Sequence, residues 1–145
     1  MSTHTAVISW SRTSPDYTYA SYNRAHTWVT GSGHEIAASS APEFGGDADR
    51  VNPEEAFVAA LASCHMLTFL AIAAKAGITV DRYEDAAEGV LTKQDGTLSI
   101  TRVVLRPRIR FGGEPPSVEA LAHLHEQAHR GCFIANSVKT VVTVE

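Results

Sequence analysis

Two cysteines are the residues in this 145-residue chain with the clearest capacity for chemistry. Cys64 lies in a long apolar stretch and is followed by His65, whereas Cys132 follows Arg130 and Gly131 at the end of a predicted helix. A thiolate is a nucleophile, and two neighbouring thiols can be oxidised to a disulfide. A second interpretation stays open, because unreactive cysteines are often small buried hydrophobes.

Residues 52–77 are predicted to form the long helix that positions Cys64. Asn52 is a good N-cap, Pro53 suits the first helical position, and Glu55 occupies the capping-box position three residues after Asn52. Gly77 is a natural end. Nearly every residue in between is apolar or small, so we expect a helix that is buried on all its faces. Its many alanines would let another helix approach closely.

The remaining elements indicate an α+β fold with antiparallel sheets, because the strands arrive as hairpins rather than in alternation with helices. The expected elements are a strand at 6–12, a hairpin at 17–40, a loop at 40–51, strands at 78–93 and 98–111, a helix at 117–131, a short turn or helix at 133–137 and a strand at 138–145. Pro107 suggests an edge or a bulge in the second of the long strands.

Composition limits the class of protein. The length suits a single domain spanning residues 1–145, and a formal net charge of −4 without a basic cluster argues against a nucleic-acid partner. The first residues show no secretory signal, so we expect a cytoplasmic protein with free, metal-bound or redox-active cysteines. The apolar run reaches the length of a membrane span. However, Ser63, His65 and Thr68 within it favour a buried helix and no membrane partner.

Histidines offer two further interpretations. His125 and His129 lie one helical turn apart, with His123 nearby, and such a pair could bind a metal. Most helical histidines are not ligands, so the prediction is no metal site. His65 could serve Cys64 as a base, but adjacent helical residues point about 100° apart. His65 is therefore expected to border a pocket or an interface.

The segment NPEEAFVAALASC resembles the signature of the OsmC/Ohr family of thiol peroxidases. Glu54 and Cys64 are ten residues apart, and Cys132 lies where that family has its second cysteine. The resemblance implies an OsmC-like fold with antiparallel sheets around a long central helix, assembled as an intertwined homodimer. It also implies that Cys64 is the peroxidatic cysteine, that Cys132 is the resolving cysteine and that Glu54 holds an active-site arginine.

Arg24 is the preferred candidate for that arginine, since it lies thirty residues before Glu54, and Arg50 and Arg12 are alternatives. A cation near Cys64 would favour the thiolate and stabilise the charge that develops on a leaving alkoxide. The chain departs from the family pattern at Phe133, where many members have proline.

The resemblance implies a function without a bound cofactor. Cys64 would reduce an organic hydroperoxide and become a sulfenic acid, which Cys132 would convert to a disulfide for reduction by an external dithiol of the lipoyl type. Phe57, Leu61 and His65 are the predicted substrate pocket, with Leu67 and Phe69 extending its apolar wall. The alternative is a non-catalytic protein of the same fold that binds a small apolar ligand or senses redox state.

Helix geometry adds a constraint on assembly. Ten residues place Glu54 and Cys64 about 15 Å apart along one straight helix, so the two cannot share a small site within it. Two such helices, crossing antiparallel about a two-fold axis, would bring Glu54 of one chain towards Cys64 of the other. We therefore expect a homodimer with its sites at the subunit interface.

Overall fold

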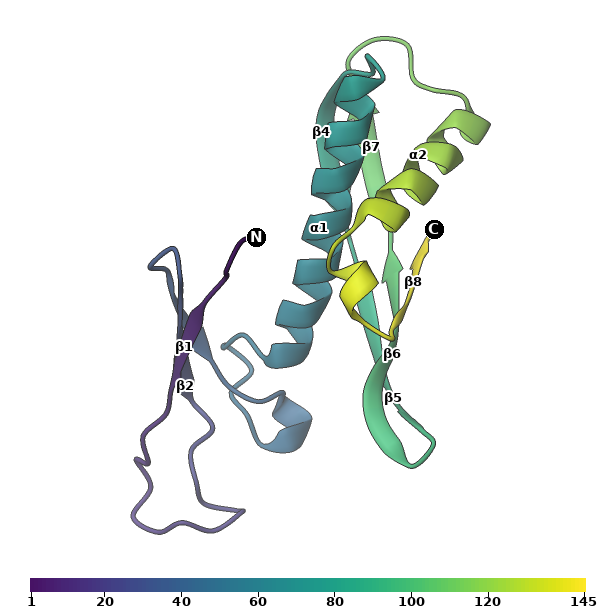
Figure 1. The fold of residues 1–145 in the computed structure, drawn as a ribbon. Helices are drawn as coiled ribbons and strands as arrows, with labels where there is room; N and C mark the ends of the chain where they lie inside the picture. The colour runs from purple at the N-terminus through teal and green to yellow at the C-terminus, as the bar shows by residue number, and fades with distance from the viewer. The chain divides into compact units, whose positions relative to one another are not determined.

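A computed structural model describes all residues, 1–145, and has the expected mixed α+β composition with two α-helices (Figure 1). It contains two compact units, Met1–Ala56 and Phe57–Glu145, which we call the N-terminal and C-terminal units and describe separately.

The N-terminal unit is built on a three-stranded antiparallel sheet in the order β1-β2-β3. Its strands are β1 (Ala6–Ser9), β2 (His26–Thr30) and β3 (Glu35–Ala38), and a short 3-10 helix, η1 (Pro42–Phe44), follows them. Trp28 of β2 lies opposite Ile8 of β1 and Ile36 of β3, so large apolar side chains meet across the sheet.

The predicted hairpin arm begins at His26 rather than at residue 17, and the aromatic segment before it is irregular. In this segment, side chains form the hydrogen bonds to backbone groups that a neighbouring strand would otherwise form. The Asn23 side chain accepts from Thr13 N–H and donates to the Ser11 carbonyl, while Ser21 and Thr18 form a turn of their own. Such local hydrogen bonds compete with a strand ladder despite a favourable composition.

Helix α1 (Pro53–Lys75) confirms the predicted long helix. Its capping box is formed in both directions: Glu55 N–H donates to Asn52 Oδ1 at 2.9 Å, and Asn52 N–H donates to Glu55 Oε2 at 3.2 Å. Gly77 ends the helix with a φ of 74°, a conformation that favours glycine.

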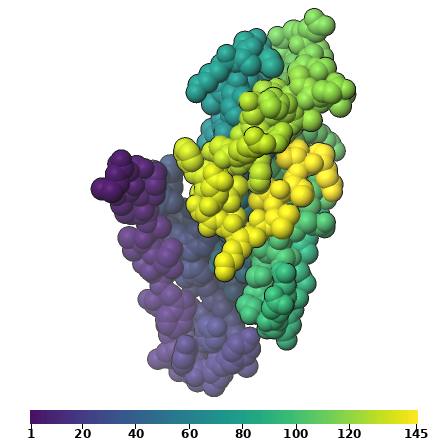
Figure 2. Space-filling view, turned by 45° about the vertical axis from the view of Figure 1, so that its right-hand side comes forward, coloured from purple at the N-terminus to yellow at the C-terminus, as the bar shows by residue number.

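The C-terminal unit contains two further sheets. A two-stranded sheet joins β4 (Val80–Asp85) to β7 (Pro107–Phe111), and a three-stranded sheet has the order β5-β6-β8, with β5 (Glu88–Gln94), β6 (Thr97–Leu105) and β8 (Val141–Val144). Every pair in these sheets is antiparallel except β6 with β8, which is parallel. In Figure 2 the yellow C-terminal segment lies against the green strands, in agreement with that pairing.

Each of the two predicted long strands is broken in the middle, so residues 78–93 and 98–111 each contribute to two sheets. The break has a side-chain cause. Arg106 N–H donates to Asp85 Oδ1 at 2.7 Å instead of to a neighbouring strand, and Pro107 has no N–H to donate. Pro107 therefore marks the change of sheet rather than a bulge within one strand.

Helix α2 (Val118–Gly131) starts where expected, with Ser117 Oγ accepting from Ala120 N–H at 3.1 Å. A 3-10 helix, η2 (Ala135–Ser137), follows it. One core joins Phe69 and Ala73 of α1 to Leu124 and Ala128 of α2, and a second packs Leu61 against β6.

Burial of α1 on all its faces was expected, but within one chain the helix buries one stripe. Its buried residues recur every four positions, at Leu61, His65, Phe69 and Ala73. Leu67 on another face is 59% exposed. The helix has the length and hydropathy of a membrane span, but its buried stripe packs against protein as a core helix does.

Candidate active site

Cys64 and Cys132 are in contact, although 68 residues separate them in sequence. Both are free thiols; Cys132 is buried and Cys64 is partly exposed. Cys64 lies in the middle of α1, and Cys132 is the residue that caps the C-terminus of α2. The two helices of the C-terminal unit thus bring one accessible sulfur and one enclosed sulfur together.

The surroundings of Cys64 favour its thiolate. Burial raises the pKa of the Cys64 thiol, but four contacts outweigh it and leave the pKa below its usual value. In order of effect they are the N–H of Ile134, the thiol of Cys132, the N–H of Phe133 and the hydroxyl of Thr68. Thr68 lies one turn after Cys64, and its hydroxyl donates to the Cys64 carbonyl at 2.8 Å.

The pKa of the Cys132 thiol moves in the opposite direction. Burial is the largest cause of the rise, and the neighbouring Cys64 adds to it. The N–H groups of Ala135 and Ile134 lower this pKa without reversing the rise; Ala135 N–H donates to Cys132 Sγ at 3.4 Å. Cys64 is thus the thiol whose surroundings favour ionisation, and Cys132 is the thiol whose burial opposes it.

Close packing at the end of α2 positions Cys132. A Cβ atom added to Gly131 would lie 3.0 Å from Thr68 Cγ2, so glycine allows α2 to approach α1 one residue before the cysteine. Asn136 fixes the turn that follows, because its N–H donates to the Cys132 carbonyl and its side chain donates to the Arg130 carbonyl, both at 3.0 Å.

Sequence reasoning missed the groups that surround the Cys64 sulfur. Thr68 could have been found, because it lies one helical turn after Cys64 and shares its face. The N–H groups of Phe133 and Ile134 carry no side-chain signal. Phe133 nevertheless matters as a residue that is not proline, since proline would remove one donor.

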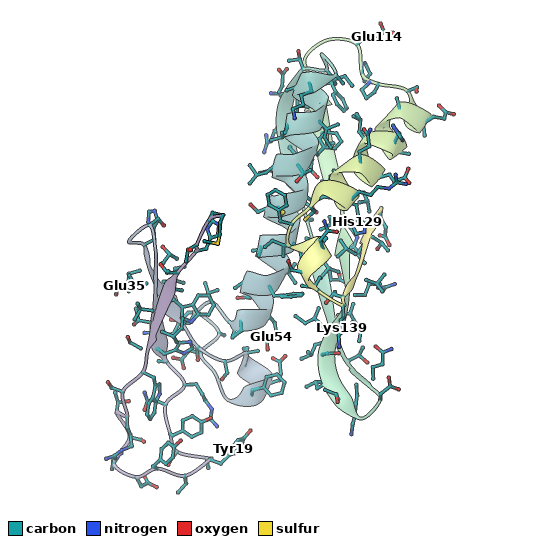
Figure 3. All side chains as sticks on the ribbon, in the orientation of Figure 1. Tyr19, Glu35, Glu54, Glu114, His129 and Lys139 are labelled. Atoms are coloured by element: carbon teal, nitrogen blue, oxygen red, sulfur yellow. The ribbon has the colours of Figure 1, made fainter.

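The N-terminal unit contains a pocket of about 410 Å³ that is lined by Arg24 and Glu54. Its wall is largely apolar and includes the aromatic rings of Trp10, Tyr17 and Tyr22, and the other lining residues are Ile8, His26, Ser39, Ser40 and Pro53. Figure 3 shows Glu54 on the first turn of α1. An apolar pocket with a few convergent polar groups is typical of a ligand site.

The guanidinium of Arg24 is held in a fixed position. It donates to the carbonyls of Tyr22 at 2.8 Å and Tyr19 at 2.7 Å, and it lies over the Tyr22 ring at 3.9 Å from the centroid. Gly45, at a φ of 77°, leaves room for it, since an added Cβ atom would be 3.1 Å from Arg24 Cζ.

Arg24 and Glu54 form no ion pair with each other. Arg24 Nε and Glu54 Oε2 are both buried without a hydrogen-bond partner. Buried polar atoms are normally satisfied, so each retains unused capacity to bind a further group. Of the three candidate arginines, Arg24 is the one that lines this pocket with Glu54.

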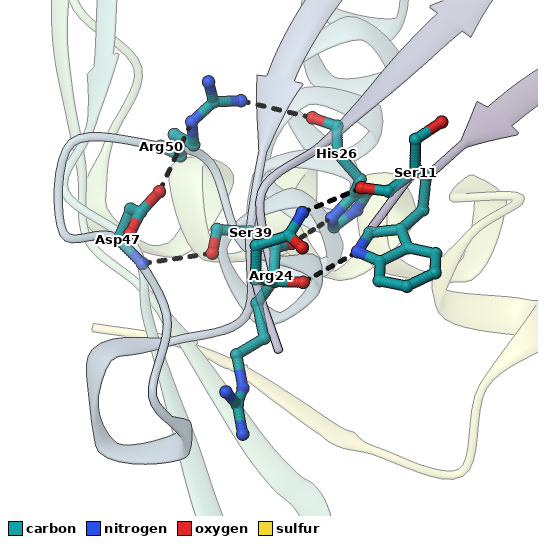
Figure 4. A network of polar contacts seen from close by, with 8 residues as sticks. Ser11, Arg24, His26, Ser39, Asp47 and Arg50 are labelled. Atoms are coloured by element: carbon teal, nitrogen blue, oxygen red, sulfur yellow. Dashed lines mark hydrogen bonds and ion pairs between the residues drawn. The ribbon is translucent and has the colours of Figure 1, made fainter. Parts of the chain in front are cut away.

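The two alternative arginines make structural contacts elsewhere in the N-terminal unit. Arg50 pairs with Asp47 at 3.6 Å and donates to the His26 carbonyl at 3.3 Å, as part of the network drawn in Figure 4. Arg12 donates to the carbonyls of Ser14 and Pro15. The guanidinium groups of both residues therefore stabilise local loop structure.

The residues of the predicted substrate pocket lie in the interior of the C-terminal unit. Leu61 is 0% exposed and packs against Val103 and Leu105, while Phe57 is partly buried against the same cluster. His65 is 1% exposed. Substrate contact with Leu61 and His65 stays a prediction, and it would require these enclosed side chains to become accessible.

The His65 side chain forms a hydrogen bond with His125 of α2 and none with Cys64. His65 Nε2 lies 3.0 Å from His125 Nδ1, and the His125 ring also stacks on Phe69 at 4.6 Å. The structure contains no group of three His, Cys, Asp or Glu side chains arranged to hold a metal. His129 is the other titratable residue near His65 that lowers its pKa.

Protonation of His65 is expected to destabilise the fold in acid. Burial, and then the neighbouring His125 and His129, lower the pKa of His65 from 6.5 to about 4. The unfolded chain therefore binds more protons between these two values, and stability falls as the pH drops from 6.5 towards 4. The loss from this group would reach about 3 kcal/mol. Urea unfolding at pH 7 and pH 4.5 measures it, with His65→Leu as the comparison. An equal pH dependence in that variant would contradict the assignment.

Solved structures with the same fold span essentially the whole chain. An OsmC-like protein of unknown function from Vibrio cholerae, VCA0330, is 47% identical with a TM-score of 0.93, covering 100% of this chain and 99% of that one. An organic hydroperoxide resistance protein from Elizabethkingia anophelis is 20% identical with a TM-score of 0.75, covering 100% and 96%. The latter likeness shows the fold alone.

Sequence comparison gives the same relationship. The protein YmaD of Bacillus subtilis is 25% identical over 126 residues, which are 85% of this chain and 84% of YmaD. The family model described as OsmC-like protein matches residues 46–145, and this range contains Glu54 and both cysteines. The chain, with its long helix, mixed sheets and paired thiols, belongs to the OsmC-like protein family.

Proposed function

We propose that this protein is a thiol-dependent peroxidase that reduces organic hydroperoxides. The observation that carries the proposal is the contact between two free thiols, one partly exposed at Cys64 and one buried at Cys132. The lowered pKa of Cys64 and the raised pKa of Cys132 agree with different roles for the two. A peroxidatic thiol must be ionised and accessible, whereas a resolving thiol must be close and can stay protonated until it is needed. Membership of the OsmC-like family, with relatives named for organic hydroperoxide resistance, supports a redox role of this kind.

The proposed reaction uses the two sulfurs in turn. The Cys64 thiolate attacks one peroxide oxygen, the O–O bond breaks, and the alkoxide leaves and takes up a proton, so that the peroxide becomes an alcohol and Cys64 a sulfenic acid. Cys132 then attacks the sulfenic sulfur, forming a disulfide and releasing water. An external dithiol, for which a lipoyl group is the preferred candidate, reduces the disulfide by exchange.

The role proposed for Arg24 is to bind the peroxide oxygens and the developing alkoxide, and the role proposed for Glu54 is to hold the Arg24 guanidinium when the substrate is bound. Both line an apolar pocket and each has a buried atom without a partner. About 15 Å of helix separates Glu54 from Cys64. We therefore propose a homodimer in which Arg24 and Glu54 of one protomer serve Cys64 of the partner subunit.

The free faces of the chain support this assembly. The exposed side of α1 is formed by small or apolar residues, namely Ala59, Ala60, Ser63, Leu67, Ala71 and Ala74. Val7 and Ile8 on the edge strand β1 are 62% and 60% exposed. Apolar surface along a helix and a sheet edge is typical of surfaces that pair with another copy.

The direct test is turnover of an alkyl or fatty-acid hydroperoxide by the purified protein, with dihydrolipoamide as the reductant. We expect loss of the peroxide in proportion to oxidised dithiol, and a Cys64–Cys132 disulfide in the enzyme when the dithiol is omitted. Intact-mass and peptide mapping detect that disulfide. Absence of turnover with several dithiols would favour the alternative of a non-catalytic protein that binds an apolar ligand in the aromatic pocket.

Replacing Arg24 with methionine is expected to lower peroxidase activity by about a hundredfold, because a fixed donor to the developing oxyanion is lost. The matched control is Arg12→Met, which removes a guanidinium from the same segment but outside the pocket. Steady-state kcat/KM for both variants checks this expectation. Equal activities for the two would remove Arg24 from the site.

The same variant tests whether sites are shared between subunits. Cys64→Ser and Arg24→Met chains, carrying different tags and purified as mixed dimers, should regain one working site in each mixed dimer. In an equilibrated mixture of the two chains, half of the dimers are mixed and each of these has one working site of two. The mixture should therefore reach about a quarter of the wild-type activity, although each parent has almost none. Mixed dimers that stay inactive would place Arg24 and Cys64 of one site in the same chain.

A further inference from the structure

The proposed chemistry leaves one buried polar pair unused, the histidines that join α1 to α2. His65 Nε2 and His125 Nδ1 are 3.0 Å apart, and their rings are nearly parallel, at 11°, with centroids separated by 5.3 Å. His65 is 1% exposed, whereas the partly buried His125 lines a groove between α2 and the strands β7 and β8. A side-chain hydrogen bond between two helices is rare enough in a protein core to require an explanation.

The surroundings of His65 determine which nitrogen carries the proton. His65 Nδ1 is buried and has no partner. A buried N–H without an acceptor is costlier than a bare nitrogen lone pair, so the proton is on Nε2 and is donated to His125 Nδ1. His125 then holds its own proton on Nε2, towards the groove. Burial lowers the pKa of both rings, which keeps the pair neutral near pH 7.

The position of the pair relates it to the cysteines. His65 directly follows Cys64, and His125 lies seven residues, or about two helical turns, before Cys132. Thr68 and Gly131 provide another close approach of the same two helices, beside the cysteines. The hydrogen bond between His65 and His125 therefore limits the rotation of α2 against α1. The two cysteines meet at the C-terminal end of α2 in the same contact between the helices.

We propose that His65 and His125 form a positioning pair that holds Cys132, and the N–H groups following it, against Cys64. Neither ring touches the reacting atoms; the pair acts through the placement of α2. The inference rests on the proposed function for one step, in which the Cys132 sulfur bonds to the Cys64 sulfur, the S–O bond of the sulfenic acid breaks, and the Cys132 proton leaves with the hydroxyl as water. Loosening the pair slows this step and raises the pKa of Cys64.

His125→Phe and His125→Asn separate the hydrogen bond from the packing. Phenylalanine keeps a ring stacked on Phe69 but leaves the His65 proton without an acceptor. Asparagine loses the ring but places an amide oxygen near the position of Nδ1. We expect His125→Phe to slow disulfide formation by about tenfold or more, and His125→Asn to restore much of the rate. The control is His123→Phe on the exposed face of the same helix.

Two readouts distinguish positioning from general damage. Rapid mixing with one equivalent of hydroperoxide, followed by trapping of the sulfenic acid with a dione, gives the rate of disulfide formation. The pH dependence of Cys64 alkylation gives its pKa, which should rise in His125→Phe and return towards the wild-type value in His125→Asn. Thermal unfolding identifies the variants that stay folded. A folded His125→Phe with wild-type disulfide rate and wild-type Cys64 pKa would overturn the proposal.

A peroxide-independent arm keeps the two proposals distinguishable. Diamide oxidises neighbouring thiols to a disulfide without any peroxidase activity. If the wild type consumes no hydroperoxide, the proposed function fails, yet slower diamide-driven closure of Cys64–Cys132 in His125→Phe still supports positioning. If the rate of diamide-driven disulfide formation is unchanged in His125→Phe while the wild type is an active peroxidase, the positioning role is wrong and the proposed function is retained.

Discussion

Replacing Cys64 with serine is expected to lower the rate of hydroperoxide reduction by at least about a thousandfold, because the nucleophile itself is removed. A serine hydroxyl stays protonated in surroundings that favour a thiolate, and its oxygen attacks a peroxide poorly. The substitution is small, and Cys64 is only partly enclosed, so the fold should persist. The N–H groups of Ile134 and Phe133 would then face a neutral oxygen.

Ser63→Ala is the matched control for this substitution, since residue 63 is the exposed neighbour on the same helix. Both variants are compared by initial rates at saturating dihydrolipoamide and by thermal unfolding. We expect Ser63→Ala to stay within about twofold of the wild-type rate. Peroxide turnover that survives in folded Cys64→Ser would show that the chemistry lies elsewhere, and the proposed function would then be wrong.

Local signals in the sequence predicted the elements whose ends depend on their own residues. Asn52 and Glu55 form the expected capping box, and Ser117 caps the second helix as predicted. The α+β class followed from the order of strands and helices, and it is confirmed. These features depend on contacts between residues that are close together in the sequence, so the sequence alone is enough to predict them.

Features that depend on distant contacts were less predictable. The long strands break where Asp85 accepts the Arg106 N–H, a pairing across 21 residues. Within one chain α1 buries a single stripe, because apolar composition does not reveal which faces of a helix the chain itself covers. For the site, the family resemblance implied a pair made of Cys64 and Cys132, and the structure places the two thiols in contact. The hydrogen bond between His65 and His125 crosses 60 residues, so pattern alone could not reveal it.

Replacing Cys132 with serine is expected to leave the first turnover intact and to lower sustained turnover by about a hundredfold or more, because the resolving sulfur is lost. A serine hydroxyl can still donate a hydrogen bond to the Cys64 thiolate, so that thiol should keep most of its lowered pKa. One equivalent of hydroperoxide would then be reduced rapidly, and the enzyme would accumulate as the Cys64 sulfenic acid.

Cys132→Ala separates the two roles of this side chain. Alanine removes the hydrogen bond as well as the sulfur, so the pKa of Cys64 should rise and the first turnover at pH 7 should also slow. Stopped-flow measurement of the first equivalent, with dione trapping of the product, compares the two variants. If Cys132→Ser sustains turnover with dihydrolipoamide at the wild-type rate, the dithiol reduces the sulfenic acid directly. Cys132 would then contribute to the site only through its hydrogen bond, and the proposed two-cysteine cycle would be reduced to a one-cysteine cycle.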